Sequence, residues 1–241
     1  MRPNHAVVSQ EEWLQARKSL LALEKEQTHL RDRVNAERQA LPWVVLDKTY
    51  RFETRDGPKS LADLFDGRSQ LLLYHFMFGE NWEAGCPSCS FLADHFDGTL
   101  PHLNHHDVTL VAASNAPLEK IEAYRKRMDW HFPWVSSHGS DFNRDFHVSF
   151  SPSEMARGKV SYNFTEIDSK EAHEELPGLS AFYKDEGGTV YHTYSTYARG
   201  LEELVSTFML LDRAPKGRNE GTIMDFVRRH DEYDGEPRRR A

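Results

Sequence analysis

Apolar residues at intervals of three and four predict one long amphipathic helix near the start of the chain. Ser9 and Glu12 form a capping-box pattern that opens this helix, and Leu41-Pro42 ends it near Ala40. The other faces are densely charged, so another surface must cover its narrow apolar seam. We expect that surface to be the chain's own domain or a second subunit, which makes a homo-oligomer a prediction. The seam consists of Trp13, Ala16, Leu20, Leu23, Leu30 and Val34.

A continuous apolar run from Leu71 to Phe78 predicts a central strand that is buried on both faces. Further strands and helices alternate after it in a β-α-β-α-β-β-α order. This order predicts an α/β sheet that is mostly parallel, with helices on its faces. The other expected elements are strands at residues 50–54, 107–114, 179–183 and 189–194 and helices near 89–96, 117–128 and 201–208.

The pattern divides the chain into three parts. Residues 1–49 form an N-terminal helical extension, and residues 50–212 form the α/β domain. Within this domain, residues 150–176 are polar and weakly periodic, which indicates an insertion of loops with room for one edge strand. From 213 to 241, proline and glycine alternate with charge, so we expect a mobile tail with a short helical stretch near residues 224–228.

Composition limits the classes of partner and the compartment. An apolar fraction of 39% and an aromatic fraction of 12% can supply a core, while a net charge of −8 argues against nucleic acid or an anionic membrane as partner. We find neither a secretory signal pattern nor a long apolar run and expect a cytoplasmic location. Cytoplasmic thiols are kept reduced, so paired cysteines there are more often catalytic, redox-sensing or metal-binding than structural.

The only two cysteines, Cys86 and Cys89, form a Cys-x-x-Cys pair directly after the central strand. At the start of a helix, free amides favour a thiolate on Cys86, while Cys89 lies one turn further in. This predicts thiol-disulfide exchange in which Cys86 attacks and Cys89 resolves. Protein or small-molecule disulfides and a reducing partner are the expected partners. Pro87 suits the first helical turn, whereas the negative charges of Glu80 and Glu83 oppose the thiolate.

Two aromatic residues near the pair allow more than one interpretation. His75, in the central strand, is either the group that accepts the proton of Cys89 or a core histidine. Trp82 either shapes a substrate groove beside Cys86 or covers the core.

A metal site would need ligands beyond the two thiols, because tetrahedral zinc takes four. His102, His105 and His106 cluster in the sequence, but a solvated loop explains them better. We therefore assign no metal and no cofactor to the site. A metal-binding or redox-sensing module that uses the same cysteines remains an alternative to the enzyme.

The residues of about Tyr50 to Leu211 resemble the thioredoxin fold in four respects. These are a strand, a loop with an aromatic residue, Cys-x-x-Cys at a helix start, and a proline just ahead of a β-hairpin. The resemblance implies a thioredoxin-like fold with a central mixed sheet flanked by helices, plus the long N-terminal helix. It also implies that Pro177, in the place of the family's cis proline, faces the dithiol.

More closely, the whole chain resembles a bacterial thioredoxin-like family catalogued as domain of unknown function 899. That family's name implies a fold but no substrate. Peroxiredoxins carry Thr or Ser three residues before the reactive cysteine, and Glu83 stands there, which weakens the further alternative of a thiol peroxidase. The shared segments are Val8-Ser9-Gln10-Glu11-Glu12-Trp13, Tyr74-His75-Phe76-Met77-Phe78, Gly85-Cys86-Pro87-Ser88-Cys89-Ser90, Trp134-Val135-Ser136-Ser137, Ser140-Asp141-Phe142-Asn143 and Tyr194-Ser195-Thr196-Tyr197-Ala198-Arg199-Gly200.

Overall fold

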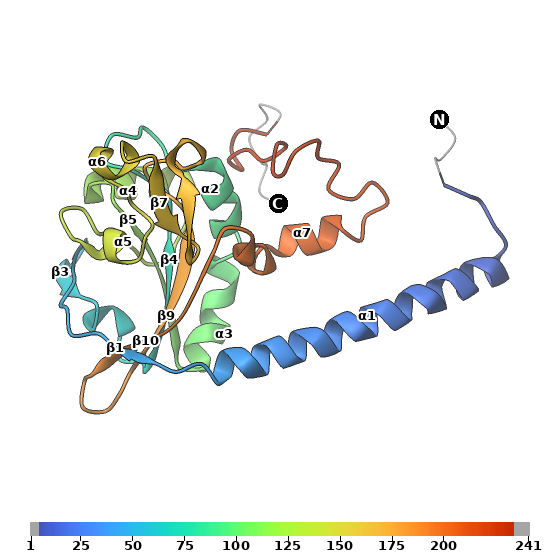
Figure 1. Cartoon of the computed structure of the whole chain (residues 1–241), viewed down its shortest axis with the longest axis horizontal. Coiled ribbons are helices and arrows are strands. Elements are labelled where there is room, and N and C mark those ends of the chain that lie inside the picture. The colour runs from blue at the N-terminus through green and yellow to red at the C-terminus, as the bar shows by residue number, and fades with distance from the viewer. Residues whose placement is uncertain (1–4, 234–241) are drawn as a thin grey trace. The chain divides into compact units, whose positions relative to one another are not determined.

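A computed structural model describes residues 5–233 of the chain (Figure 1). The chain divides into two compact units at Pro42/Trp43. The domain limits at 49/50 and 212/213 stay predictions.

The first unit is helix α1 (Gln10–Gln39), and it begins as predicted. The backbone N–H of Glu12 donates to Ser9 Oγ at 3.3 Å, and the Glu12 carboxylate accepts from Ser9 N at 2.9 Å, which completes the capping box. No side chain of α1 is buried, so the surface that would cover its apolar seam stays a prediction. In the part of the chain that the structure describes, neither α1 nor any other helix combines the length and apolarity that a membrane span requires.

The second unit is built on an eight-stranded mixed sheet with the order β1-β10-β9-β4-β5-β6-β2-β3. Strand β4 (Gln70–His75) lies inside it, parallel to β5 (Val108–Ser114) and antiparallel to β9 (Gly178–Lys184). Within this sheet β5 also pairs in parallel with β6, and the remaining pairs are antiparallel, so the expectation of a mostly parallel sheet was wrong. The other strands are β1 (Val44–Val45), β2 (Arg51–Thr54), β3 (Gly57–Ser60), β6 (Trp134–Ser136) and β10 (Val190–Tyr197).

A central strand that leads to the cysteine helix, a parallel neighbour and a following antiparallel hairpin give the thioredoxin-like fold. Helices α2 and α3 lie on one side of the sheet and α5 on the other (Figure 1). The helices are α2 (Pro87–Ala93), α3 (Leu100–His105), α4 (Leu118–Arg127), α5 (Phe142–Asp145), α6 (Pro152–Met155) and α7 (Ser206–Leu211), with 3₁₀ turns η1 (Asp63–Phe65), η2 (Asp97–Thr99), η3 (Ser169–Glu171) and η4 (Ala198–Leu204).

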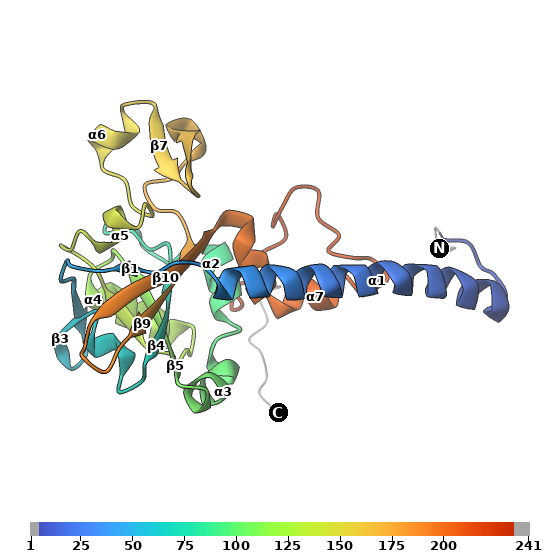
Figure 2. The same ribbon diagram turned by 60° about the horizontal axis from the view of Figure 1, so that its bottom comes forward.

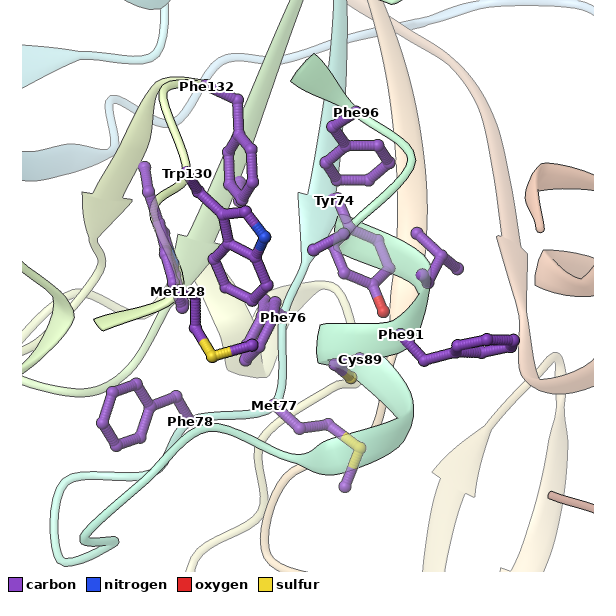
Figure 3. Close-up of a cluster of buried hydrophobic side chains, with 14 of the residues drawn as sticks. Tyr74, Phe76, Met77, Phe78, Cys89, Phe91, Phe96, Met128, Trp130 and Phe132 are labelled. Atoms are coloured by element: carbon purple, nitrogen blue, oxygen red, sulfur yellow. The ribbon is translucent and has the colours of Figure 1, made fainter. Parts of the chain in front are cut away.

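Two hydrophobic cores cover the two faces of β4. Tyr74 and Phe76 pack in the core that contains Cys89 and the inner face of α4, and Figure 3 shows part of this core. Leu71 and Leu73 pack in the other core, with α5. Because side chains alternate along a strand, neighbours in β4 belong to different cores.

The insertion at residues 150–176 forms a small lobe that carries α6 and an antiparallel hairpin of β7 (Lys159–Tyr162) and β8 (Thr165–Asp168). Figure 2 shows α6 and β7 standing away from β4, β5 and β9. The hairpin is a two-stranded sheet of its own, so the expectation of an edge strand was wrong. Val160 and Tyr162 are buried, which gives the hairpin an inner face instead of a place in the main sheet.

The segment expected to be a mobile tail packs against the domain as far as residue 233. Val227 is only 4% exposed, and Met224 and Phe226 pack against the core that contains Cys89. Arg127 Nε donates to the Asp231 carboxylate at 2.7 Å and so holds the segment again four residues after Val227. Residues 224–226 form a turn and 227–228 have no regular structure, so the expected helical stretch was wrong, and residues 234–241 lie outside the described residues.

Replacing Val227 with alanine tests this docking. We expect the free energy of unfolding to fall by about 1–3 kcal/mol, since buried methyl groups are lost and a small cavity remains. Urea unfolding measures the change. Ile223→Ala is the matched control, because Ile223 is 62% exposed and should change the free energy by less than about 0.5 kcal/mol. Equal effects of the two substitutions would show that the segment does not pack in solution.

Candidate active site at the dithiol

The turn between β4 and α2 fixes the position of Cys86. Its backbone N–H donates to the carbonyl of Met77 at 3.0 Å, and its own carbonyl accepts from the backbone N–H of Ser90 at 2.9 Å. Cys86 is thereby the N-cap residue of α2, with Pro87 in the first turn, where a missing N–H costs nothing. Cys89 follows one turn later, on the inner side of the helix.

The two thiols differ in exposure and in acidity. Both are free; Cys89 is 2% exposed, and Cys86 is partly exposed. A hydrogen bond from the Cys89 thiol, helped by the N–H groups of Cys89 and Ser88 and by the charge of Arg229, lowers the pKa of Cys86 to about 6 against the opposing effect of burial. Burial and the hydrogen bond to Cys86 raise the pKa of Cys89 well above its ordinary value. The opposition expected from Glu80 and Glu83 therefore does not prevail.

Tyr74 is the functional candidate that the sequence interpretation missed. Its hydroxyl is hydrogen-bonded to the Cys89 thiol, and Figure 3 shows it directed toward the turn of α2 that carries Cys89. The ring is held edge-on by Phe96 at 5.4 Å and Phe76 at 6.0 Å. Burial, followed by the charge of Cys89, raises the pKa of Tyr74, so the hydroxyl keeps its proton and can donate it in a hydrogen bond.

His75 lies on the opposite face of β4 from Tyr74 and Cys89. Its ring stacks on Phe142 at 5.4 Å, and its Nε2 is 2.8 Å from Ser180 Oγ. Burial and the neighbouring His192 lower the pKa of His75 to about 3, so the imidazole is neutral. This position fits the core-histidine interpretation and places the ring away from the proton that Cys89 must lose.

The docked C-terminal segment contributes an arginine to the dithiol loop. Arg229 donates to the carbonyl of Gly85 from Nε at 3.1 Å and from Nη2 at 2.8 Å. In α2, Ser90 Oγ donates to the Cys86 carbonyl at 2.8 Å and lies 2.8 Å from the hydroxyl of Tyr124. The loop is therefore braced from the side of α4 and from the C-terminal segment.

Trp82 is bonded to the segment of residues 174–177, which also contains Pro177. The indole N–H of Trp82 donates to the Glu174 carboxylate, and the carbonyl of Pro177 accepts from Tyr162 Oη at 2.7 Å. No cis peptide bond occurs among the described residues, so Pro177, in the place of the family's cis proline, is trans in this structure. Leu176 N–H donates to Val148 O at 2.8 Å, so bonds from two other segments hold this stretch of chain.

A buried carboxyl, Glu175, fastens the same segment to α5 and to residues that follow β5 and α5. Its two oxygens accept from Ser149 Oγ at 2.6 Å, Asn115 Nδ2 at 3.1 Å and Asn143 Nδ2 at 3.5 Å. Burial raises the pKa of Glu175 to about 7 against the effect of these donors. Ser137 also donates to Asn143 at 2.8 Å, so part of the polar segment after Val135 builds this brace. The only sequence signal was a charged residue directly before Leu176-Pro177.

The described residues offer no metal-ligand set at the dithiol. Among residues 5–233, no group of three or more His, Cys, Asp and Glu side chains lies close enough together to hold a metal ion. His102, His105 and His106 are exposed at α3 and its C-cap.

A family model described as "Bacterial protein of unknown function (DUF899)" matches residues 2–233. No curated protein matches the chain. Solved structures similar to it include a mutant of PrxQ from Xylella fastidiosa, at 11% identity, 67% of this chain, 88% of that chain and a TM-score of 0.39. The peroxidoxin BcpB from Mycobacterium tuberculosis is 12% identical, over 71% of this chain and 97% of that chain, with a TM-score of 0.40. A putative protein disulfide isomerase from Bacteroides thetaiotaomicron is 17% identical, over 75% of this chain and 95% of that chain, with a TM-score of 0.37. Similarity at this level says nothing of the reaction or substrate of this chain.

Alkylation of Cys86 as a function of pH tests the electrostatics of the site. Iodoacetamide reacts with the thiolate, so we expect the wild-type rate to be half-maximal near pH 6. In Arg229→Gln the pKa of Cys86 rises and the rate at pH 6 falls about twofold to fivefold, because a stabilising positive charge is lost. Arg229→Lys should recover part of the rate. Arg213→Gln, a change at an exposed arginine of the same segment, is the control, and an identical profile for Arg229→Gln would contradict the assignment.

Proposed function

Because the chain belongs to this bacterial family of unknown function, whose name supplies no reaction, we propose from the geometry of the dithiol that it is a thiol-disulfide oxidoreductase. The observation that carries the proposal is the inequality of the two thiols. An accessible thiol with a lowered pKa at a helix start is a nucleophile, and a buried thiol beside it with a raised pKa attacks only after the first has reacted.

The proposed reaction has two exchange steps. The Cys86 thiolate attacks a substrate disulfide, forms a mixed disulfide and expels one substrate thiolate, which takes a proton from water. Cys89 then attacks the Cys86 sulfur, and the Cys86–Cys89 disulfide forms as the second substrate thiolate leaves. The proton that Cys89 loses goes to this leaving thiolate. A dithiol reductant returns two electrons and two protons to restore the free pair.

Tyr74 serves the second step in this scheme. Cys89 must become a thiolate in surroundings that disfavour charge, and the Tyr74 hydroxyl is placed to donate a hydrogen bond to that thiolate. The substrates proposed are protein or small-molecule disulfides, with the reaction in the cytoplasm.

Replacing each cysteine with serine tests the assignment of roles. Cys86→Ser should abolish reduction of a model disulfide such as insulin, because no nucleophile remains. Cys89→Ser should accumulate mixed disulfides on Cys86, because the second step is blocked. Mass spectrometry of the trapped adducts and a turnover assay measure both outcomes. Equal activity of the two variants would contradict the proposal, and so would a wild-type protein that reduces no disulfide and binds one equivalent of zinc through both thiols.

Removing the Tyr74 hydroxyl should slow the second step alone. In Tyr74→Phe we expect resolution of a preformed mixed disulfide to slow by about 10- to 100-fold, the worth of a hydrogen bond to a charged group. Attack by Cys86 should stay within about twofold of wild type in stopped-flow measurements. Tyr50→Phe is the matched control, because Tyr50 is also a buried tyrosine but its hydroxyl binds Asp145. Equal slowing of both steps would show that the substitution merely perturbs the core.

A further inference from the structure

The turn of the β7–β8 hairpin contains a residue that its backbone disfavours. Asn163 and Phe164 join the two strands, and both have positive φ, at 51° and 62°. Two-residue turns of this kind favour Asn followed by Gly. Asn163 suits its place, but a bulky side chain such as that of Phe164 is strained in the left-handed region.

Other strained positions in the domain are offset by hydrogen bonds within the fold. Ala198, at φ 48°, donates its N–H to Tyr162 Oη at 3.0 Å, and Met224, at φ 63°, donates its N–H to Glu220 at 2.8 Å. Phe164 is different, because its side chain is 80% exposed to solvent and its ring lies edge-on to Tyr197 at 5.4 Å between ring centres. It therefore combines backbone strain with exposed apolar surface.

This hairpin is fastened at the end of β4 from which the dithiol loop leaves, where the Met77 carbonyl accepts from Cys86 N–H. Tyr162, two residues before Phe164, donates to the carbonyl of Pro177, and Gly178 pairs with His75 at the end of β4. Burial and, to a lesser extent, the Cys89 thiol raise the pKa of Tyr162 against the opposing effect of the bond from Ala198 N–H. The ring of Tyr197 contacts both Tyr162 and Phe164 and sets the tip of the hairpin in place.

We propose that Phe164 docks polypeptide disulfides by contacting an apolar side chain next to the substrate cysteine. The inference rests on the proposed function and names its substrate class. The hairpin stands away from the main sheet (Figure 2), so a substrate must extend beyond the reacting sulfurs to reach Phe164. A small disulfide that reaches only Cys86 gains nothing from this residue.

The test compares Phe164→Gly with wild type on three disulfides. These are a peptide with phenylalanine next to a disulfide-bonded cysteine, the same peptide with serine there, and 2-hydroxyethyl disulfide. For the phenylalanine peptide we expect kcat/KM to fall about tenfold, the effect of exposing one apolar side chain. For the other two disulfides it should stay within about twofold. Phe164→Leu should recover most of the loss, and Leu210→Ala, at a 70% exposed leucine of α7, is the control for lost apolar surface.

Two further measurements separate this inference from the proposed function. Calorimetry measures the affinity of the phenylalanine peptide with its cysteines replaced by serine, so weaker binding by Phe164→Gly supports docking even where wild type reduces nothing. Equal binding and equal kcat/KM in wild type and Phe164→Gly would overturn the docking and leave the reaction intact. We also expect the Tm of Phe164→Gly not to fall and to rise by up to about 4 °C, because strain is relieved. A lower Tm would mean that Phe164 is kept for stability and would overturn the inference.

Discussion

Strand β4 lies inside the sheet, so its side chains from Leu71 to His75 are directed toward one of two separate cores. Because side chains alternate along a strand, Tyr74 faces the core beneath α2 and its neighbour His75 faces the other core. After His75 the chain leaves the sheet. A hydrogen bond of 3.0 Å from Cys86 N–H to Met77 O then holds the start of α2 next to the end of the strand. The hydroxyl of Tyr74 consequently lies against Cys89, and the geometry of the dithiol follows from two-sided burial of one strand.

The unequal acidity of the thiols is a consequence of this burial. Two thiolates side by side in a low-dielectric site would repel each other, so the surroundings stabilise one negative charge at a time. Cys86 has the backbone amides of α2, the Cys89 thiol and the charge of Arg229, whereas the reduced state leaves Cys89 protonated. In the proposed reaction Tyr74 then acts on Cys89, on the inner side of the pair. Each sulfur has its own donor, and the proposed order of attack follows from which sulfur water can reach.

Local signals in the sequence predicted the elements that depend on local structure. The capping box of Ser9 and Glu12, the strand leading to the cysteines and the hairpin after Pro177 all follow from spacing and turn residues. The face of His75 could not be predicted, because a run that is apolar on both faces has no alternation to mark. Arg229 lies far along the chain from Gly85, and its contact depends on the docking of Val227. The bond from Tyr162 to the Pro177 carbonyl likewise comes from a separate segment, which no local pattern reveals.

Backbone strain distinguishes residues that hold the hairpin from the residue at its tip. Ala198, whose φ is positive, donates its N–H to the Tyr162 hydroxyl, and that hydroxyl donates to the Pro177 carbonyl. The strained backbone at Ala198 therefore helps to hold the hairpin against the segment that contains Pro177. At Phe164 the fold would be served better by glycine, which adopts the same φ without a clash and exposes no ring. Stability alone would therefore select against phenylalanine at this place. The proposed contact with a substrate polypeptide, made outside the folded chain, gives the side chain a physical reason to be there.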